Sequence, residues 1–157
     1  MNWATSWLDH PEAPLPLAEL AAFEARLGKR LPESYREFLL RHNGGEHSIA
    51  AFDFTSADGT ANSSWIQRFL SVGTDPKTSI EATAHFYWDA DRLSRSLLPI
   101  AEDIGNNLLC IDLIDGQDNT IYFWDHELEH LRNAERPRAN VSPVAPSMPT
   151  LMLQLHE

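Results

Sequence analysis

The first half of the chain places apolar residues at helical spacing. They recur every three or four positions, with charged residues between them, at Leu17, Leu20, Phe23 and Leu27. This period is typical of a helix that buries one face. Gly28 follows, and glycine tolerates the left-handed conformation that ends many helices. We therefore predict an amphipathic helix over residues 17–27.

A second helix is expected directly after the first. Pro32 suits the first helical position, because the amide that proline lacks would be unpaired there. An apolar face with the spacing i, i+3, i+4 and i+7 follows, formed by Tyr35, Phe38, Leu39 and His42. The run Asn43-Gly44-Gly45 predicts the end of this helix.

Two further helices are predicted from short apolar stripes that each follow a serine. Ser79 precedes a stripe formed by Ile80, Ala84 and Tyr87. Ser147 precedes a stripe near the end of the chain, formed by Leu151, Met152 and Leu155. A serine in this position accepts a hydrogen bond from the first turn of a helix, so both serines are interpreted as N-caps.

The remaining apolar runs predict strands. Residues 49–54 are interpreted as a strand, and residues 55–64 as a polar loop. Residues 65–72 fit either a strand or a helix, because their aromatic and apolar positions satisfy both periods. Residues 97–101 are apolar but contain Pro99, so we place this segment at the edge of a sheet, where the missing amide does least damage.

Two further runs, residues 108–113 and 120–124, are the clearest strands in the sequence, and the turn residues between them predict a hairpin. The order of helices and strands lacks regular alternation. It indicates an α+β fold, with N-terminal helices and a C-terminal helix packed on a mainly antiparallel sheet. We expect one domain over residues 1–157, with an irregular lead-in (1–16) and a proline-rich segment (136–149) before the last helix.

Charge limits the possible partners. The chain carries 23 acidic and 12 basic residues, a net charge of −11. Nucleic acids and anionic membranes bind clustered cations, so we expect neither as a partner, and a basic protein is the natural complement. The single cysteine, Cys110, lies in an apolar run, and neither a signal peptide nor a membrane-spanning segment is recognisable. These features favour the cytoplasm.

The acidic residues are concentrated in one block. Residues 96–131 contain eight acids and no Lys or Arg. Because this block includes the predicted hairpin, folding would gather its charges and attract a basic partner, although simple solubility is an equal explanation. Trp124 is a candidate apolar anchor or a core residue. The candidate partner-binding residues are Asp112, Asp115, Asp118, Trp124, Asp125 and Glu127.

Two metal-like motifs have simpler explanations. The run His126-Glu127-Leu128-Glu129-His130 matches the H-E-x-x-H pattern, in which a helix presents two histidines to zinc and the glutamate activates water. Here the motif directly follows a strand-like run, so a zinc hydrolase is only a remote alternative. The acids near residues 112–119 do not have the spacing of a calcium loop and suit a hairpin turn. We predict no cofactor and no enzymatic activity.

Four motifs in a fixed order resemble the SUKH superfamily. The first is the stretch from Leu31 to Leu39 followed by Asn43-Gly44-Gly45. The second is residues 98–103 with Gly105-Asn106 and residues 109–112. The third is residues 121–127, and the fourth is residues 144–147 before the last helix. The chain departs from the family pattern at Met148-Pro149 and at Ile104.

The resemblance implies an α+β domain that binds other proteins. Bacterial members resemble immunity proteins, which neutralise a toxin domain, and many such toxins are nucleases with basic surfaces. The expected function is therefore direct binding of a cognate toxin domain. The alternative that the family offers is a regulatory scaffold, the role of its fungal members.

Overall fold

The computed structural model describes residues 10–11, 13–46, 50–56, 58–114 and 119–157. Its helices are α1 (Leu17–Leu27), α2 (Glu33–Arg41), α3 (Ile80–Trp88) and α4 (Met148–Gln154), with a 3-10 helix, η1 (His126–Leu131). Its strands are β1 (His10–Pro11), β2 (Gly45–Glu46), β3 (Ala51–Thr55), β4 (Ala61–Phe69), β5 (Leu97–Asp103), β6 (Leu108–Asp112), β7 (Ile121–Trp124) and β8 (Val141–Ala145).

The strands form an antiparallel sheet in the order β1-β2-β4-β5-β6-β7-β8, and β3 pairs with β4 outside this path. The sheet curls, so that β3 comes back against β8. Aromatic rings fill the space that the curl encloses: the ring of Phe54 lies 4.4 Å from that of Phe123, and the ring of Phe52 lies 5.7 Å from it. Buried aromatic pairs of this kind stabilise the curl beyond the area that they bury.

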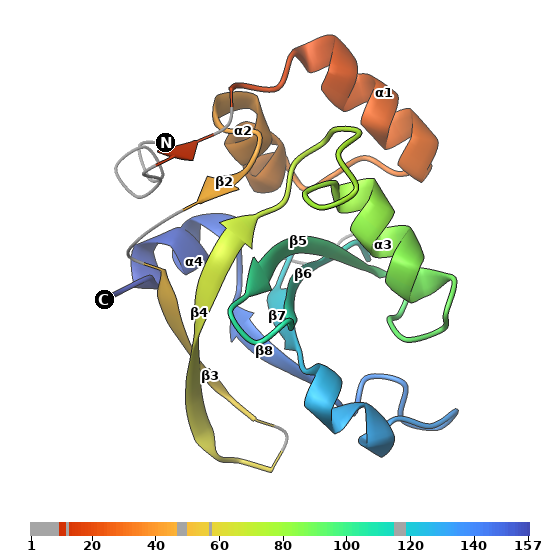
Figure 1. Ribbon diagram of the computed structural model, residues 1–157, viewed down its shortest axis with the longest axis vertical. Coiled ribbons are helices and arrows are strands. Elements are labelled where there is room, and N and C mark those ends of the chain that lie inside the picture. Colours follow the sequence, from red (N-terminus) through yellow and green to blue (C-terminus); the bar gives the residue numbers. More distant parts are fainter. Residues whose placement is uncertain (1–9, 12, 47–49, 57, 115–118) are drawn as a thin grey trace.

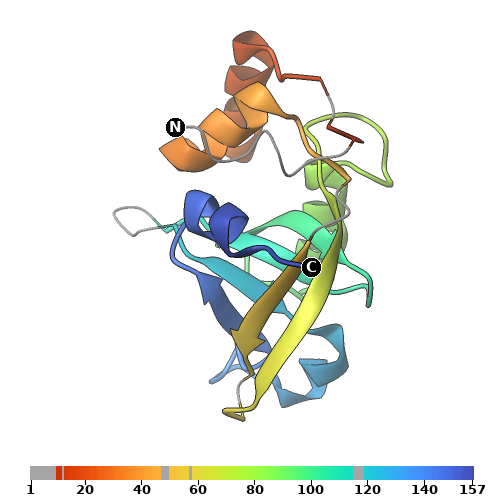
Figure 2. The ribbon, with the colours of Figure 1, turned by 90° about the vertical axis from the view of Figure 1, so that its left-hand side faces the viewer.

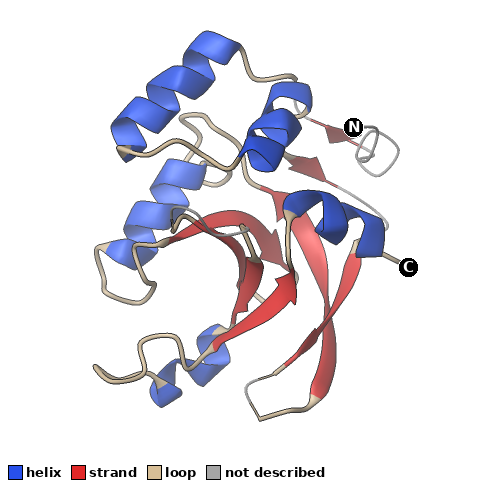
Figure 3. Ribbon diagram, turned by 180° about the vertical axis from the view of Figure 1, so that it is seen from behind, coloured by secondary structure: helices blue, strands red, loops and turns tan. Residues whose placement is uncertain are grey.

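The helices lie mostly at one end of the sheet (Figures 1 and 2). Helix α4 packs on β8 and contacts α2, while α3 packs on β5. The tip of the β3–β4 hairpin and η1 lie at the opposite end of the molecule (Figure 3). The α+β prediction, with N-terminal helices and a C-terminal helix on an antiparallel sheet, is confirmed.

The predicted helices form for the expected reasons. Gly28 ends α1 with a left-handed φ of 75°, and its amide donates to the carbonyl of Glu24 at 2.9 Å. Ser79 Oγ accepts from the Ala82 amide at 3.1 Å, and Ser147 Oγ accepts from the Thr150 amide at 3.3 Å. Pro32 is the N-cap of α2 and not its first helical residue, a shift of one position.

The hairpin prediction is also confirmed. Strands β6 and β7 pair antiparallel, with Leu108 opposite Trp124 and Ile111 opposite Ile121. All five residues of β6 are buried, so this pair forms the centre of the core. The turn that joins the two strands falls partly in residues 115–118, outside the described residues.

The sequence predicts that the strand containing Pro99 lies at a sheet edge. This prediction is wrong, because β5 is an interior strand of the sheet. β5 pairs with β4 on one side and with β6 on the other. The β4 ladder reaches only residues 101–103 of β5, and the β5–β6 register shifts between Pro99 and Ala101. Pro99 therefore lies outside the part of β5 that pairs with β4, so its missing amide does not remove a hydrogen bond between these two strands.

Two other segments form strands where the sequence indicated loop or ambiguity. The ambiguous stretch is part of β4, which begins at Ala61, inside the predicted polar loop, because residues 61–65 pair with β3. In the proline-rich segment, residues 141–145 form β8. Pro143 lies opposite Tyr122 in β8, which is the last strand in the order of the sheet. Proline is tolerated in such a strand.

No helix among the described residues is long and apolar enough to cross a membrane.

Candidate protein-binding surface

A cleft of about 510 Å³ opens at the end of the molecule opposite α1 and α2. Its lining comes from the β3–β4 hairpin, the turn between β5 and β6, the end of β7 and η1. We call it the acidic cleft. Its lining residues are Phe54, Ser56, Asp58, Asn62, Ser63, Ser64, Asp103, Ile104, Gly105, Asn107, Phe123, Asp125, Glu127, Leu128 and Leu131.

The charged lining residues of the acidic cleft all have the same sign. Asp58, Asp103, Asp125 and Glu127 contribute carboxylates, and no Lys, Arg or His is among the described residues of the lining. The Thr60 amide donates to Asp58 Oδ1 at 2.9 Å and lowers the pKa of that carboxyl, so Asp58 is charged at neutral pH. A concave surface of one sign focuses the electrostatic potential toward ligands of the opposite sign.

Apolar groups lie among these charges. Ile104, in the β5–β6 turn, is 67% exposed, and Leu131, at the end of η1, is 38% exposed. Phe54 and Phe123 lie deeper, and their rings contact each other at a tilt of 39°. The surface thus combines charge, which steers a partner, with apolar area, which contributes affinity when it is covered.

Asp103 holds the cleft floor in shape. Its side chain is buried and accepts four hydrogen bonds: from the amides of Gly105 at 2.9 Å and Asn107 at 2.7 Å, from Ser64 Oγ at 2.7 Å, and from Asn107 Nδ2 at 3.1 Å. These bonds fix the β5–β6 turn against β4 and leave Ile104 pointing outward. The carboxylate is therefore a positioning group and has no spare acceptor sites for a partner.

Helix η1 is fixed at both of its ends. Asp125 Oδ1 accepts from the Glu127 amide at 2.9 Å, which caps its start. Further along, Arg92 binds Glu129 with two hydrogen bonds, of 2.5 and 3.1 Å, and lies over the rings of Tyr87 and Trp124 at 4.9 and 5.7 Å. The bonds from Arg92 lower the pKa of Glu129, which stays charged and keeps the link intact.

Comparison with known proteins identifies the family. The profile of the SMI1 / KNR4 family (SUKH-1) matches residues 14–154, nearly the whole chain. The chain belongs to this family. The SPbeta prophage-derived uncharacterized protein YokK of Bacillus subtilis (strain 168) is 28% identical over 125 residues. That match covers 71% of this chain and 62% of YokK, so the chain spans less than two thirds of this relative's length.

One solved structure is similar to part of this chain. A protein from Pseudomonas syringae pv. tomato is 24% identical, with 75% of this chain and 73% of that chain covered and a TM-score of 0.46. The resemblance read from the four sequence motifs is confirmed by the SUKH-1 match.

In this SUKH-1 chain the structure separates the residues that the sequence proposed for partner binding. Asp125 and Glu127 line the acidic cleft, and Glu127 is exposed. Asp115 and Asp118 lie outside the described residues. Asp112 and Trp124 are buried.

The two buried candidates have partners inside the domain. Asp112 Oδ2 accepts from Arg138 Nη1 at 3.2 Å, at the end of β6 away from the cleft. Trp124 is 1% exposed, and its Nε1 donates to the carbonyl of Arg92 at 3.1 Å. Of the two roles left open for Trp124, the structure supports the core.

Sequence reasoning missed Asp58, Ile104 and Leu131 as members of the cleft. Asp58 lies outside the acidic block, in the turn that the β3–β4 hairpin makes, and only strand pairing brings it toward η1. Asp58-Gly59 and Gly105-Asn106 are both turn signals, so the sequence indicates where the chain reverses but not that the two turns meet.

The H-E-x-x-H motif of this SUKH-1 chain does not form the helix that zinc proteases use. Residues 126–131 form a 3-10 helix, in which positions i and i+4 point about 120° apart rather than the roughly 40° of an α-helix. His126 Nδ1 lies 2.6 Å from Asn107 Oδ1, and Glu129 is bound to Arg92. Within the described ranges, no group of three or more His, Cys, Asp or Glu could hold a metal ion.

Proposed function

We propose that this chain is an immunity protein that binds a basic toxin domain through the acidic cleft and blocks that domain's activity. Three facts support the proposal. The chain belongs to SUKH-1, which is a family that includes immunity proteins; its net charge is −11; and one of its relatives is derived from a prophage. The observation that carries it is the cleft itself, whose described lining residues provide four carboxylates and exposed apolar groups and include no cation. The proposed site of action is the cytoplasm.

The proposed mechanism needs only binding. Charge complementarity raises the rate of encounter with a basic partner, by factors of about 10 to 10³ for strongly steered pairs. Ile104 and Leu131 would then be covered, which slows dissociation. A nuclease active site must attract phosphates and is therefore basic, so the surface that suits the cleft best is the one whose occlusion stops the enzyme.

Co-expression tests this function directly. If the neighbouring gene encodes a protein with a C-terminal toxin domain, that domain is expressed in cells with and without this chain, and the killing of the cells is measured. Relief of killing, together with a stoichiometric complex on gel filtration, is expected. Several captured partners and no relief from any neighbouring toxin domain would favour the regulatory scaffold instead.

The role of the cleft is tested by charge reversal at Glu127, which is exposed and lies on the cleft rim. Glu127→Lys should slow association with an inactivated toxin domain about tenfold at low salt and change dissociation less, because steering acts on encounter. Glu135→Lys makes the same change of charge at an exposed position outside the cleft lining, and it should change the rate less than twofold.

Stopped-flow or surface plasmon resonance measurements at two salt concentrations give the association and dissociation rates. Added salt should reduce the difference between wild type and Glu127→Lys. Equal slowing by Glu127→Lys and Glu135→Lys would mean that only net charge matters, and the cleft would lose its role while the immunity function could stand.

A further inference from the structure

Strand β4 extends beyond the strand that pairs with it on the cleft side. β5 pairs with β4 only from Ile66 onward, and the chain leaves β5 after Asp103. Among the described residues, the last backbone hydrogen bond on this side runs from the Ile104 amide to the Trp65 carbonyl, at 3.0 Å. Residues 61–64 of β4 therefore pair with β3 on one side and with no described strand on the other.

The hydrogen bonds of the hairpin show which backbone groups of β4 face the open side. In an antiparallel pair, successive residues direct their N–H and C=O groups alternately toward the partner strand and away from it. The Ile66 amide donates to the Ala50 carbonyl at 2.9 Å, so Ile66 faces β3 and Trp65 faces away from it. The register is unbroken from Trp65 to Ala61, so Ser63 and Ala61 also face away from β3. Their N–H and C=O groups have no hydrogen-bond partner among the described residues.

This open edge borders the acidic cleft. Ser63 is one of the cleft's lining residues, and both Ser63 and Ala61 are exposed. Solvent also reaches three carboxylates of the same lining, those of Asp58, Asp125 and Glu127. Residues 61–64 include neither a proline nor a charged residue, the usual means by which natural proteins block an open strand edge. The edge thus combines unpaired main-chain groups with negative charge.

The opposite edge of the hairpin, on β3, is less suited to a basic partner. There the Ala51 amide donates to the His156 carbonyl at 2.9 Å, so Asp53 and Thr55 face outward by the same alternation. This edge lies against β8. The carboxylate of the groove beside it, Asp53, lies 3.1 Å from His156 Nε2. The β3 edge therefore serves as a control within the same hairpin.

We propose that the acidic cleft binds its partner as an added β-strand, in which a basic, extended segment of the partner protein pairs with Ala61 and Ser63. The segment exchanges main-chain hydrogen bonds with these two residues, the mode by which peptides extend an open sheet edge. Lysine or arginine side chains of the segment complement the carboxylates of the cleft. The inference rests on the proposed function of the cleft and adds the form in which the partner binds.

Titration of the full chain with a blocked pentapeptide, acetyl-Lys-Val-Lys-Val-Lys-amide, tests the edge by NMR of the backbone amides. A dissociation constant of about 1 mM is expected, because only a few backbone hydrogen bonds form. Two analogues, N-methylated either at the three lysines or at the two valines, keep the charge. Their affinities should differ by about fivefold or more, because a paired strand directs only alternate amides to the edge. Equal binding of the two analogues would overturn the proposal.

Hydrogen exchange locates the added strand. In the free chain the amides of Ala61 and Ser63 should exchange faster than those of Asn62 and Ser64, which face β3. Peptide at ten times its dissociation constant should slow the two fast amides about tenfold and leave the outward amides of β3 unchanged. Slowing on β3 instead would overturn the proposal. Slowing that grows with protein concentration in the absence of peptide would identify a second copy of this chain as the occupant and would also overturn it.

Two proline variants make the same change on the two edges. Ser63→Pro and Thr55→Pro each remove an amide that the hairpin's own pairing does not use, a place where a strand tolerates proline. Ser63→Pro should weaken the pentapeptide about fivefold or more, and Thr55→Pro should change its affinity less than about twofold. Circular dichroism checks that both variants fold. If Ser63→Pro does not fold, the methylated peptides decide the question. Equal effects of two folded variants would overturn the proposal.

An inactivated toxin domain separates this inference from the function on which it rests. Ser63→Pro should weaken the complex with that domain about tenfold or more, and Thr55→Pro should leave it close to wild type. Unchanged toxin binding by folded Ser63→Pro would overturn the added strand and leave the immunity function standing. Edge-specific binding of the pentapeptide without binding of any neighbouring toxin domain would support the strand site and overturn the immunity function.

Discussion

Among the described residues, the charged side chains of the interior are held by specific partners. Glu24 and Arg36 show this between α1 and α2. Their side chains are 12% and 10% exposed and form an ion pair, and Glu24 Oε2 also accepts from the Leu31 amide at 2.6 Å. One carboxylate thus joins the end of α1 to the connection that leads into α2. A buried pair of this kind costs little while it is complete, but it is expensive to break.

We predict that Glu24→Ala lowers the free energy of unfolding by about 3 kcal/mol, because it removes the close partner of the largely buried Arg36 guanidinium and leaves it with the exposed Glu33 at 3.7 Å. Glu33→Ala is the matched control. Glu33 is 66% exposed, pairs with exposed Arg30 at 3.2 Å and lies 3.7 Å from Arg36 Nε, so its loss should cost less than about 1 kcal/mol. Urea denaturation followed by circular dichroism measures both variants, and equal losses would contradict the buried role of Glu24.

At the scale of elements, η1 shows how one short segment is held by several weak attachments. It has no buried residues of its own, and it depends on the Asp125 cap and on the Arg92–Glu129 pair. Arg92 also anchors to the aromatic rings of α3 and β7, so the element that forms one wall of the acidic cleft is tied to the core. Within the H-E-x-x-H sequence, Glu129 makes this attachment through its ion pair with Arg92.

The geometry of η1 predicts that the motif does not hold zinc. Protein purified without chelators or metal-affinity tags should contain less than about 0.1 zinc per chain, since the 3-10 helix turns His126 and His130 to different sides. Added zinc should leave the melting temperature unchanged. About one zinc per chain, lost in both His126→Ala and His130→Ala, would refute this prediction and revive the hydrolase.

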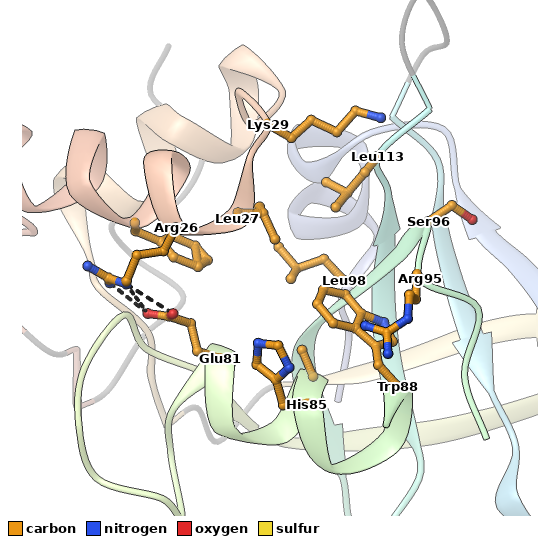
Figure 4. Close-up of a pocket in the computed structure, with 12 residues that line it drawn as sticks. Arg26, Leu27, Lys29, Glu81, His85, Trp88, Arg95, Ser96, Leu98 and Leu113 are labelled. Atoms are coloured by element: carbon orange, nitrogen blue, oxygen red, sulfur yellow. Dashed lines mark hydrogen bonds and ion pairs between the residues drawn. The ribbon is translucent and has the colours of Figure 1, made fainter. Parts of the chain in front are cut away.

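At the scale of the whole molecule, the charge is distributed unevenly. The acidic cleft lies at the end that carries the β3–β4 hairpin and η1, whereas the surface between α1 and α3 carries Arg26, Lys29 and Arg95 together with Glu81 (Figure 4). The net charge of −11 is therefore not spread evenly over the surface.

The response of stability to pH is also a property of the whole molecule, and histidine is the side chain whose ordinary pKa lies between pH 5 and 7. Burial, and then the charge of Arg41, lowers the pKa of His42. The unfolded chain therefore binds the proton more readily, so this histidine's contribution is complete above the unfolded pKa of about 6.5 and is lost as pH falls below it. The pKa of exposed His156 is raised, first by the Glu157 carbonyl and then by Asp53, and its effect has the opposite sign.

We predict that His42→Gln flattens the dependence of unfolding free energy on pH between 7 and 5, relative to wild type. Urea denaturation at pH 5, 6 and 7 measures the difference. A wild type that loses no more stability than His42→Gln on acidification would show that the pKa of His42 is not lowered.

The sequence by itself determined the elements whose signals are local. The limits of α1 follow from the period of Leu20 and Phe23 and from Gly28, and the β6–β7 hairpin follows from two apolar runs around a turn. The capping of α3 by Ser79 and of α4 by Ser147 was equally predictable from the sequence. These signals act over a few residues, so no other part of the chain is needed to interpret them.

The tertiary structure decided everything that depends on which segments meet. Pro99 sits in a central strand because the β4 ladder stops short of it, and β4 extends through polar residues because β3 pairs with them. Asp112 and Trp124 are buried, while Asp58 and Ile104 join Asp125 at the acidic cleft. Strand pairing and the curl of the sheet bring together residues far apart in the chain, and no short-range pattern records which side chains such pairing will cover and which it will leave exposed.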